Sequence, residues 1–214
     1  MTPQVHVRSR ADSLRAATLS RRASVLAAVL ALLALQVPVA LGAHHTDPVG
    51  ENDPFESDVQ EYAIKAAMTE KFVRYVGWPK ERFDDARAPI VVGVYGKDPF
   101  GEALDKAFDG RESDGRPFKI RRVTQLGDCR ACHVLYVPAN EVARAPEIAK
   151  AVKGAGVLLI GESPGFALTG GIINFYLDDQ KLRFEVNPEA AKRQKLTISS
   201  NLLKLARIVE EESE

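Results

Sequence analysis

The chain has 214 residues, of which 29 are basic and 29 acidic, so its net charge is zero. This balance argues against nucleic-acid binding, which needs a basic surface to neutralise phosphates. Hydrophobic residues make up 45% and charged residues 27% of the sequence, which is typical of a globular domain and excludes a disordered chain or a multispan membrane protein. Two cysteines exclude a disulfide-rich scaffold and a four-cysteine zinc site.

The N-terminal segment has the pattern of an export signal. Five arginines and one aspartate precede an Ala-, Leu- and Val-rich run over residues 23–40. Gln36 and Pro38 interrupt this run before it reaches the ~20 apolar residues that a membrane-spanning helix needs, and small residues follow as cleavage sites. We therefore predict a signal peptide over residues 1–43 and a periplasmic protein. The general secretory route is favoured over the twin-arginine route, which Arg21-Arg22 also suggests.

The folded part is expected to start well after the signal. Residues 44–57 are polar, contain two prolines and lack periodicity, so they predict a flexible leader. A single domain is predicted over residues 58–210, with an acidic tail over 211–214. Its first helix starts at Asp58 and ends at Trp78-Pro79, because the residue before proline is pushed out of the helical region.

Strands and helices then alternate along the chain. Continuous apolar runs predict buried strands over 90–95, 133–137 and 157–160, and alternating apolar and basic residues predict a more exposed strand over 118–123. Helices are predicted over 100–108, 140–153, 188–195 and 199–209, with a hairpin formed by 172–177 and 182–186. This order predicts an α/β domain with a largely parallel or mixed sheet, helices on both faces and a late antiparallel hairpin.

The segment from Gly161 to Gly165 fits the G-x-S-x-G pattern of a hydrolase nucleophile elbow. A hydrolase of that class needs its histidine after the serine, whereas the last histidine of this chain is His133. Pro164 also disfavours the helix that should follow the elbow. The pattern therefore predicts a glycine-rich turn, and no set of catalytic or metal-binding residues is expected.

Cys129, Cys132 and His133 form a C-x-x-C-H motif, the signature of covalent c-type haem attachment. Haem also needs a second axial ligand, and outside the signal the chain offers only Met68 and the histidines at 44–45. Exported thiols are normally oxidised, so a disulfide or dithiol is favoured over haem. The loop between the two cysteines is short, which leaves a redox-responsive bridge and a passive local staple as open alternatives.

Seven sequence blocks, spread over most of the predicted domain, resemble the YfiR-like family of periplasmic proteins. Their order along the chain is the same as in that family, and the set is more specific than any one block. The blocks are KAAM at 65–68, FVRYVGWP at 72–79, VGVYGKDPFG at 92–101, CHVLYV at 132–137, GESPGFA at 161–167, GGIINF at 170–175 and ISSNLL at 198–203.

The resemblance implies a non-enzymatic regulator with an α/β fold. The best-known members of the family restrain a membrane-bound diguanylate cyclase by binding its periplasmic sensory domain, and oxidation of their cysteines affects the integrity of the repressor. Those members form two disulfides from four cysteines, whereas this chain can form one at most. The resemblance also implies that residues 161–165 form a loop before the hairpin and that Cys132-His133 lies at the start of a core strand.

We therefore expect a periplasmic regulator, without cofactor or metal, that binds the periplasmic domain of a membrane diguanylate cyclase or sensor kinase. It could also form a homodimer. Two alternatives stay open: a c-type haem protein using Cys129, Cys132 and His133, and a small-molecule binding module using loops at strand ends. The candidate loop for contact with a partner or ligand consists of Glu162, Ser163, Pro164, Gly165 and Phe166.

Overall fold

The computed structural model describes residues 54–210 and their side chains from residue 57 onward. All of these residues belong to one compact unit. The predicted signal peptide, most of the predicted leader and the predicted acidic tail lie outside the described residues.

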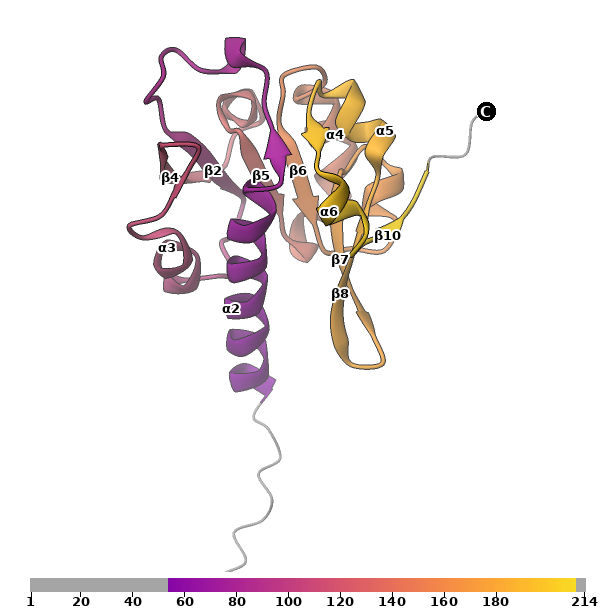
Figure 1. Ribbon diagram of the computed structural model, residues 1–214. Coiled ribbons are helices and arrows are strands. Elements are labelled where there is room, and N and C mark those ends of the chain that lie inside the picture. Colours follow the sequence, from indigo (N-terminus) through magenta and orange to yellow (C-terminus); the bar gives the residue numbers. More distant parts are fainter. Residues whose placement is uncertain (1–53, 211–214) are drawn as a thin grey trace, which may run out of the picture. The chain divides into compact units, whose positions relative to one another are not determined.

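Ten strands and nine helical segments make up the described chain (Figure 1). The strands are β1 (Val76–Gly77), β2 (Ile90–Tyr95), β3 (Glu112–Ser113), β4 (Arg116–Val123), β5 (Val134–Val137), β6 (Leu158–Gly161), β7 (Ile173–Asp178), β8 (Lys181–Val186), β9 (Thr197–Ile198) and β10 (Arg207–Ile208). The α-helices are α2 (Pro54–Val73), α3 (Glu102–Phe108), α4 (Ala145–Ala151), α5 (Pro188–Arg193) and α6 (Ser200–Leu203). The 3-10 helices are η1 (Lys80–Arg82), η2 (Leu126–Ala131), η3 (Ala139–Arg144) and η4 (Phe166–Leu168).

Eight of the strands form one mixed sheet in the order β10-β8-β7-β6-β5-β2-β4-β3. The five strands from β4 to β7 run parallel, and the β7–β8 and β3–β4 pairs are antiparallel. β10 returns to pair in parallel with the end of β8. The prediction of a mixed α/β domain with a late antiparallel hairpin is confirmed.

The sheet is covered on both faces. Side chains from α2, α3, α5 and α6 pack on one face against alternate residues of β2, β5 and β6, such as Val92, Tyr136 and Ile160. On the other face, α4 and η2 pack against the intervening residues, such as Tyr95, Leu135 and Leu159. Burial on both faces explains why these strands are continuous apolar runs in the sequence.

Several element boundaries differ from the predictions. α2 begins at Pro54, within the segment expected to be a leader, and proline is well suited to a first helical position. The helix predicted over 140–153 is divided between η3 and α4. The helix predicted over 199–209 is wrong in its second half, because the chain turns after Leu203 and pairs Arg207 and Ile208 with β8.

His133 lies just before β5, and the fold buries it with 5% of its surface exposed. Its Nδ1 accepts a hydrogen bond from the Val91 backbone N–H at 3.0 Å, and its ring stacks on Phe83 with 4.6 Å between centroids. Because Nδ1 is an acceptor, the ring proton resides on Nε2, which lies 3.3 Å from the carbonyl oxygen of Arg82. His133 is therefore a neutral histidine of the core.

Burial, assisted by the positive charge of Arg82, lowers the pKa of His133 from 6.5 to about 4. A histidine buried in its neutral form contributes stability above pH 6.5, and this contribution is lost as the pH falls toward 4, because the unfolded chain takes up the proton first. We predict that the free energy of unfolding falls by roughly 2 kcal/mol between pH 7 and pH 5 from this group alone.

Urea unfolding of the protein and of the His133→Asn variant at both pH values tests this prediction. The asparagine side chain can still accept the Val91 N–H but does not titrate. The variant should start from a lower stability and lose less of it on acidification. An equal loss in both proteins would contradict the assignment of this pH dependence to His133.

Candidate functional site

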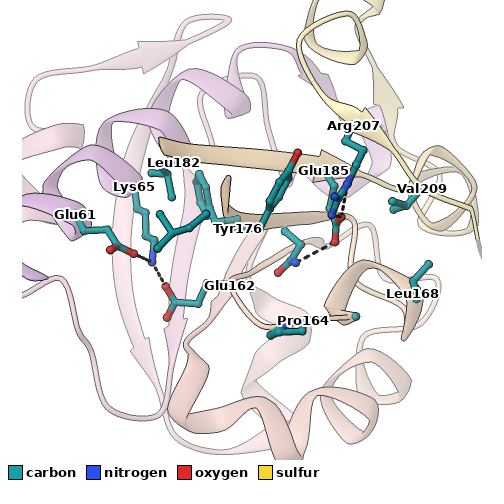
Figure 2. A pocket seen from close by; sticks show the side chains of 14 residues that line it. Glu61, Lys65, Glu162, Pro164, Leu168, Tyr176, Leu182, Glu185, Arg207 and Val209 are labelled. Carbon is teal, nitrogen blue, oxygen red and sulfur yellow. Dashed lines mark hydrogen bonds and ion pairs between the residues drawn. The ribbon is translucent and has the colours of Figure 1, made fainter. Parts of the chain in front are cut away.

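A hollow of about 550 Å³ opens between α2, the loop after β6, the β7–β8 hairpin and β10 (Figure 2). Its lining combines charged groups at two ends with apolar side chains between them. The lining residues are Glu61, Lys65, Glu162, Pro164, Gly165, Leu168, Asn174, Phe175, Tyr176, Leu177, Leu182, Glu185, Arg207 and Val209.

At one end of the hollow lies the carboxylate of Glu162, whose side chain is only 3% exposed. Lys65 forms an ion pair with it, and the hydroxyls of Tyr62 and Tyr136 donate to it at 3.0 and 2.7 Å. The backbone N–H of Ala139 donates a further bond at 2.9 Å. Four donors from α2, β5 and the start of η3 thus converge on one buried carboxylate, which satisfies the requirement that a buried charge be paired and hydrogen-bonded.

These contacts set the charge states at this end. Burial alone would raise the pKa of Glu162, but the hydrogen bond and charge of Lys65 and the bonds from Tyr136 and Ala139 outweigh it, and the pKa is lowered. Burial and the negative charge of Glu162 raise the pKa of the Tyr62 and Tyr136 hydroxyls, so both stay protonated donors. Glu162 is an ionised carboxylate whose acceptor sites are already used, not a free acid or base for catalysis.

Local sequence explains how the Glu162 loop is shaped. Gly161 and Gly171 flank the ring of Phe166, and a Cβ atom at either position would lie within 2.5 Å of ring atoms. Gly165 has a φ of 77°, in the left-handed region that favours glycine, and leads into η4. The glycines therefore allow Phe166 to fold under the loop while Glu162 turns toward α2.

At the other end of the hollow, Glu185 on β8 binds Arg207 on β10 (Figure 2). The Arg207 guanidinium also lies over the ring of Tyr176, 4.0 Å from its centroid. Asn174 on β7 donates its Nδ2 to Glu185 at 3.0 Å, but its Oδ1 is buried and has no hydrogen-bond partner within the described chain. Asn174 is only 1% exposed and lines the hollow, and its unsatisfied Oδ1 is buried behind the wall of the hollow, closed to solvent.

Apolar side chains border the opening. Leu168 on η4 and Leu177 near the tip of the hairpin line the hollow and are 49% and 61% exposed. Large apolar side chains exposed beside a concave surface are typical of binding sites for proteins or apolar ligands.

The loop predicted as a contact site divides into two sets. Glu162, Pro164 and Gly165 line the hollow, whereas Ser163 and Phe166 are buried, with 5% and 3% exposed. Burial of Ser163 agrees with the rejection of a hydrolase nucleophile, which must be accessible. A contact role for the three lining residues stays a prediction.

Cys129 and Cys132 are fully buried on the opposite face of the sheet, and both are free thiols in the structure. Burial raises the pKa of the Cys129 thiol, and burial together with Cys129 raises that of Cys132 to about 11, which disfavours reactive thiolates at neutral pH. Whether the two thiols pair stays a prediction. The Nε2 of His133, the atom that would bind haem iron, faces the Arg82 carbonyl oxygen at 3.3 Å inside the core, and we do not propose haem binding.

Several residues of the site were not foreseen from the sequence. Lys65, Tyr62 and Tyr136 surround Glu162 although they are far from it along the chain. Asn174 did carry a usable signal, because it is a polar residue inside the apolar run of a predicted strand. Arg207 was assigned to a helix, so its pairing with Glu185 could not be predicted.

Among residues 54–210, no helix is both long enough and apolar enough to cross a membrane. The same part of the chain contains no cluster of three or more His, Cys, Asp or Glu residues suited to a metal ion.

We predict that Glu162→Gln lowers the free energy of unfolding by about 2 kcal/mol at pH 7, because it leaves Lys65 with one buried partner fewer. Urea unfolding measures this loss. Because its folded pKa is lowered, Glu162 stabilises the protein above the pKa of the unfolded carboxyl, and this contribution is lost as the pH falls through the folded pKa. The variant should therefore lose less stability on acidification.

Glu102→Gln is the matched control, since Glu102 also pairs with a lysine but its side chain is 84% exposed. It should leave stability unchanged. Equal effects of the two substitutions would show that the Glu162 network does not hold α2 in place.

Comparison with known proteins gave one family match. The model of the DUF4154 family, described as YfiR/HmsC-like, matches residues 62–207. No curated protein matched the chain.

Similar solved structures include a conserved domain protein from Vibrio cholerae O1 biovar El Tor, with 13% identity and a TM-score of 0.47 over 70% of this chain. Another is an ABC domain in complex with L-Trp from Streptococcus pneumoniae, with 11% identity and a TM-score of 0.48 over 67% of this chain. The chain spans 60% of the length of each. The family match covers most of the chain and nearly all of the described domain, and the protein therefore belongs to the YfiR/HmsC-like family.

Proposed function

We propose that this protein is a periplasmic, non-enzymatic regulator that binds the extracytoplasmic domain of a membrane diguanylate cyclase and restrains the enzyme. Membership of the YfiR/HmsC-like family is the observation that carries the proposal. The fully hydrogen-bonded Glu162 and the buried Ser163 are consistent with a binding role, since neither offers a reactive group.

The hollow supports a specific mode of binding. Its rim carries the exposed side chains of Leu168 and Leu177, which an apolar side chain of the partner can cover. The charged groups at its ends are already paired within the protein, so an apolar group can enter without leaving a charge unpaired. The partner's anchor residue is therefore expected to be apolar or aromatic.

In this proposal, the regulator restrains the enzyme by shifting the population of the sensory domain toward its inactive arrangement. The regulator must bind the inactive arrangement of the sensory domain more tightly than the active one, and the difference in affinity sets the degree of restraint. Any signal that competes for the hollow would release the enzyme.

We predict that Leu168→Lys combined with Leu177→Lys weakens partner binding at least roughly tenfold, because two charges replace the apolar rim. In the native host, deletion of the gene should raise cyclic-di-GMP. The wild-type gene should restore the low level and the double variant should not. The measurement is cellular cyclic-di-GMP, with periplasmic protein levels matched by immunoblot.

Val142→Lys is the control, because Val142 is 41% exposed but does not line the hollow. It should restore the low level like the wild type. Unchanged cyclic-di-GMP after deletion would overturn the proposed function, whereas restoration by the double variant would overturn only the assignment of the hollow as the contact site.

The unsatisfied Oδ1 of Asn174 favours a second candidate, a small-molecule site in the same hollow. A ligand that covers the leucine rim would donate an N–H to this oxygen once the Asn174 side chain turns toward the hollow, because the oxygen is closed to solvent in the structure. We predict that one or more members of a panel of primary amines and amides raise the Tm of the protein, and that Asn174→Ala abolishes the increase. Equal increases in both proteins would place the ligand elsewhere.

A further inference from the structure

The sheet has an open edge at β4, at the opposite end of the strand order from β10 (Figure 1). β2 pairs with β4 along Phe118–Val123, whereas β3 reaches only Arg116 and Pro117 on the outer side. In the described part of the chain, no strand pairs with the outer side of residues 118–123. Such an edge is a template for an added strand.

The direction of the open backbone groups follows from one hydrogen bond. The carbonyl of Val123 accepts from the Gly96 N–H at 2.8 Å, so Val123 faces β2. Because successive residues of a strand alternate, Phe118, Ile120 and Arg122 direct their N–H and C=O groups away from β2. Three donors and three acceptors thus lie along the outer edge with the spacing of a ladder.

A hollow of about 400 Å³, lined by both charged and apolar side chains, lies beside this edge. Phe108 on α3 and the half-buried Phe118 and Ile120 form its apolar part, and the rings of Phe108 and Phe118 meet edge to face at 4.9 Å. Asp109 and Glu112 are exposed in its lining beside a single cation, Arg111, so the two carboxylates disfavour acidic side chains on this face. An added strand would therefore place apolar side chains here.

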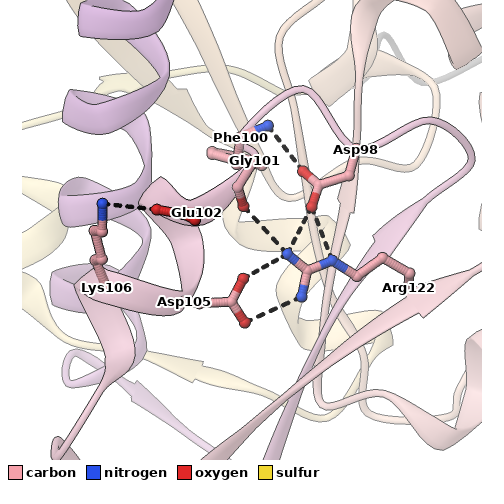
Figure 3. A network of polar contacts seen from close by, with 7 residues as sticks. All are labelled: Asp98, Phe100, Gly101, Glu102, Asp105, Lys106 and Arg122. Atoms are coloured by element: carbon pink, nitrogen blue, oxygen red, sulfur yellow. Dashed lines mark hydrogen bonds and ion pairs between the residues drawn. The ribbon is translucent and has the colours of Figure 1, made fainter.

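The other face of β4 has the opposite charge. Lys119 is exposed and has no ion-pair partner among residues 57–210, and Arg121 is 3.5 Å from Asp128 in a half-exposed pair. Arg122 lies on the face of Phe118 and Ile120, where Asp98 and Asp105 hold it, with its Nε 2.8 Å from Asp98 (Figure 3). Lys119 and Arg121 are thus the cations available to an added strand on the opposite face.

We propose that the β4 edge binds an extended segment of another protein in which acidic and apolar residues alternate, so that the segment becomes an additional strand of the sheet. Its backbone pairs with Phe118, Ile120 and Arg122. Its apolar side chains enter the hollow beside Phe108, and its acidic side chains face Lys119 and Arg121. The inference does not depend on the proposed function, because the two hollows share no residue.

Charge disfavours a second copy of this chain as the occupant. Pairing two β4 edges would bring together the Lys119 and Arg121 side chains of both copies, and like charges on adjacent strands repel. β4 itself contains no acidic residue that could offset this repulsion.

The test uses the purified full-length protein and the peptide acetyl-EVEVEVEV-amide, with a scrambled peptide of the same composition as control. Backbone amide NMR should show saturable shifts and slower hydrogen exchange at Phe118, Ile120 and Arg122, and the scrambled peptide should bind at least tenfold more weakly. A Lys119→Glu, Arg121→Glu variant should lose binding to the same degree and should gain binding to acetyl-KVKVKVKV-amide.

Lys150→Glu combined with Lys153→Glu is the matched control, because it makes the same change in net charge at exposed positions away from β4. It should bind the acidic peptide like the wild type, and the amide spectrum of each variant reports whether it folds. Absence of saturable binding at millimolar peptide, or shifts at residues outside β4 and its hollow, would overturn the proposal whether or not the protein regulates a cyclase.

Discussion

The buried carboxylate of Glu162 is the constraint on which the arrangement around the hollow depends. A charge that is removed from water must be matched by donors, and here the donors come from α2, from β5 and from the start of η3. β5 and η3 follow one another in the chain, but α2 is far from both in the sequence. Because donors from these segments all bind the Glu162 carboxylate, α2 lies against the loop after β6, and together they form one wall of the hollow.

The opposite wall is built in the same way around Glu185. Its ion pair with Arg207 joins β10 to β8, and its bond from Asn174 joins β8 to β7. The hollow thus lies between two satisfied charges and has an apolar rim formed by Leu168 and Leu177. Its charged groups have structural roles within the protein, and its rim is the part that the protein itself leaves uncovered.

The two edges of the sheet differ in how far a further strand covers them. At the β7–β8 end, the returning β10 covers the last residues of the hairpin. At the β4 end, the short β3 covers only two residues, and basic side chains follow along the strand. Basic residues on an edge strand protect against pairing with identical chains, and the same charge selects an acidic partner.

The core strands, the late hairpin and the family could be predicted from the sequence alone, because long apolar runs and ordered motif blocks are local patterns. The sequence also predicted a loop at a strand end over residues 162–166, of which Glu162, Pro164 and Gly165 line the hollow. Three features required the folded structure: Tyr62, Lys65 and Tyr136 meet at Glu162, Arg207 belongs to a strand, and His133 is a neutral core residue. These outcomes depend on hydrogen bonds between segments far apart in the chain, and no local pattern records which distant donor a buried acceptor will find.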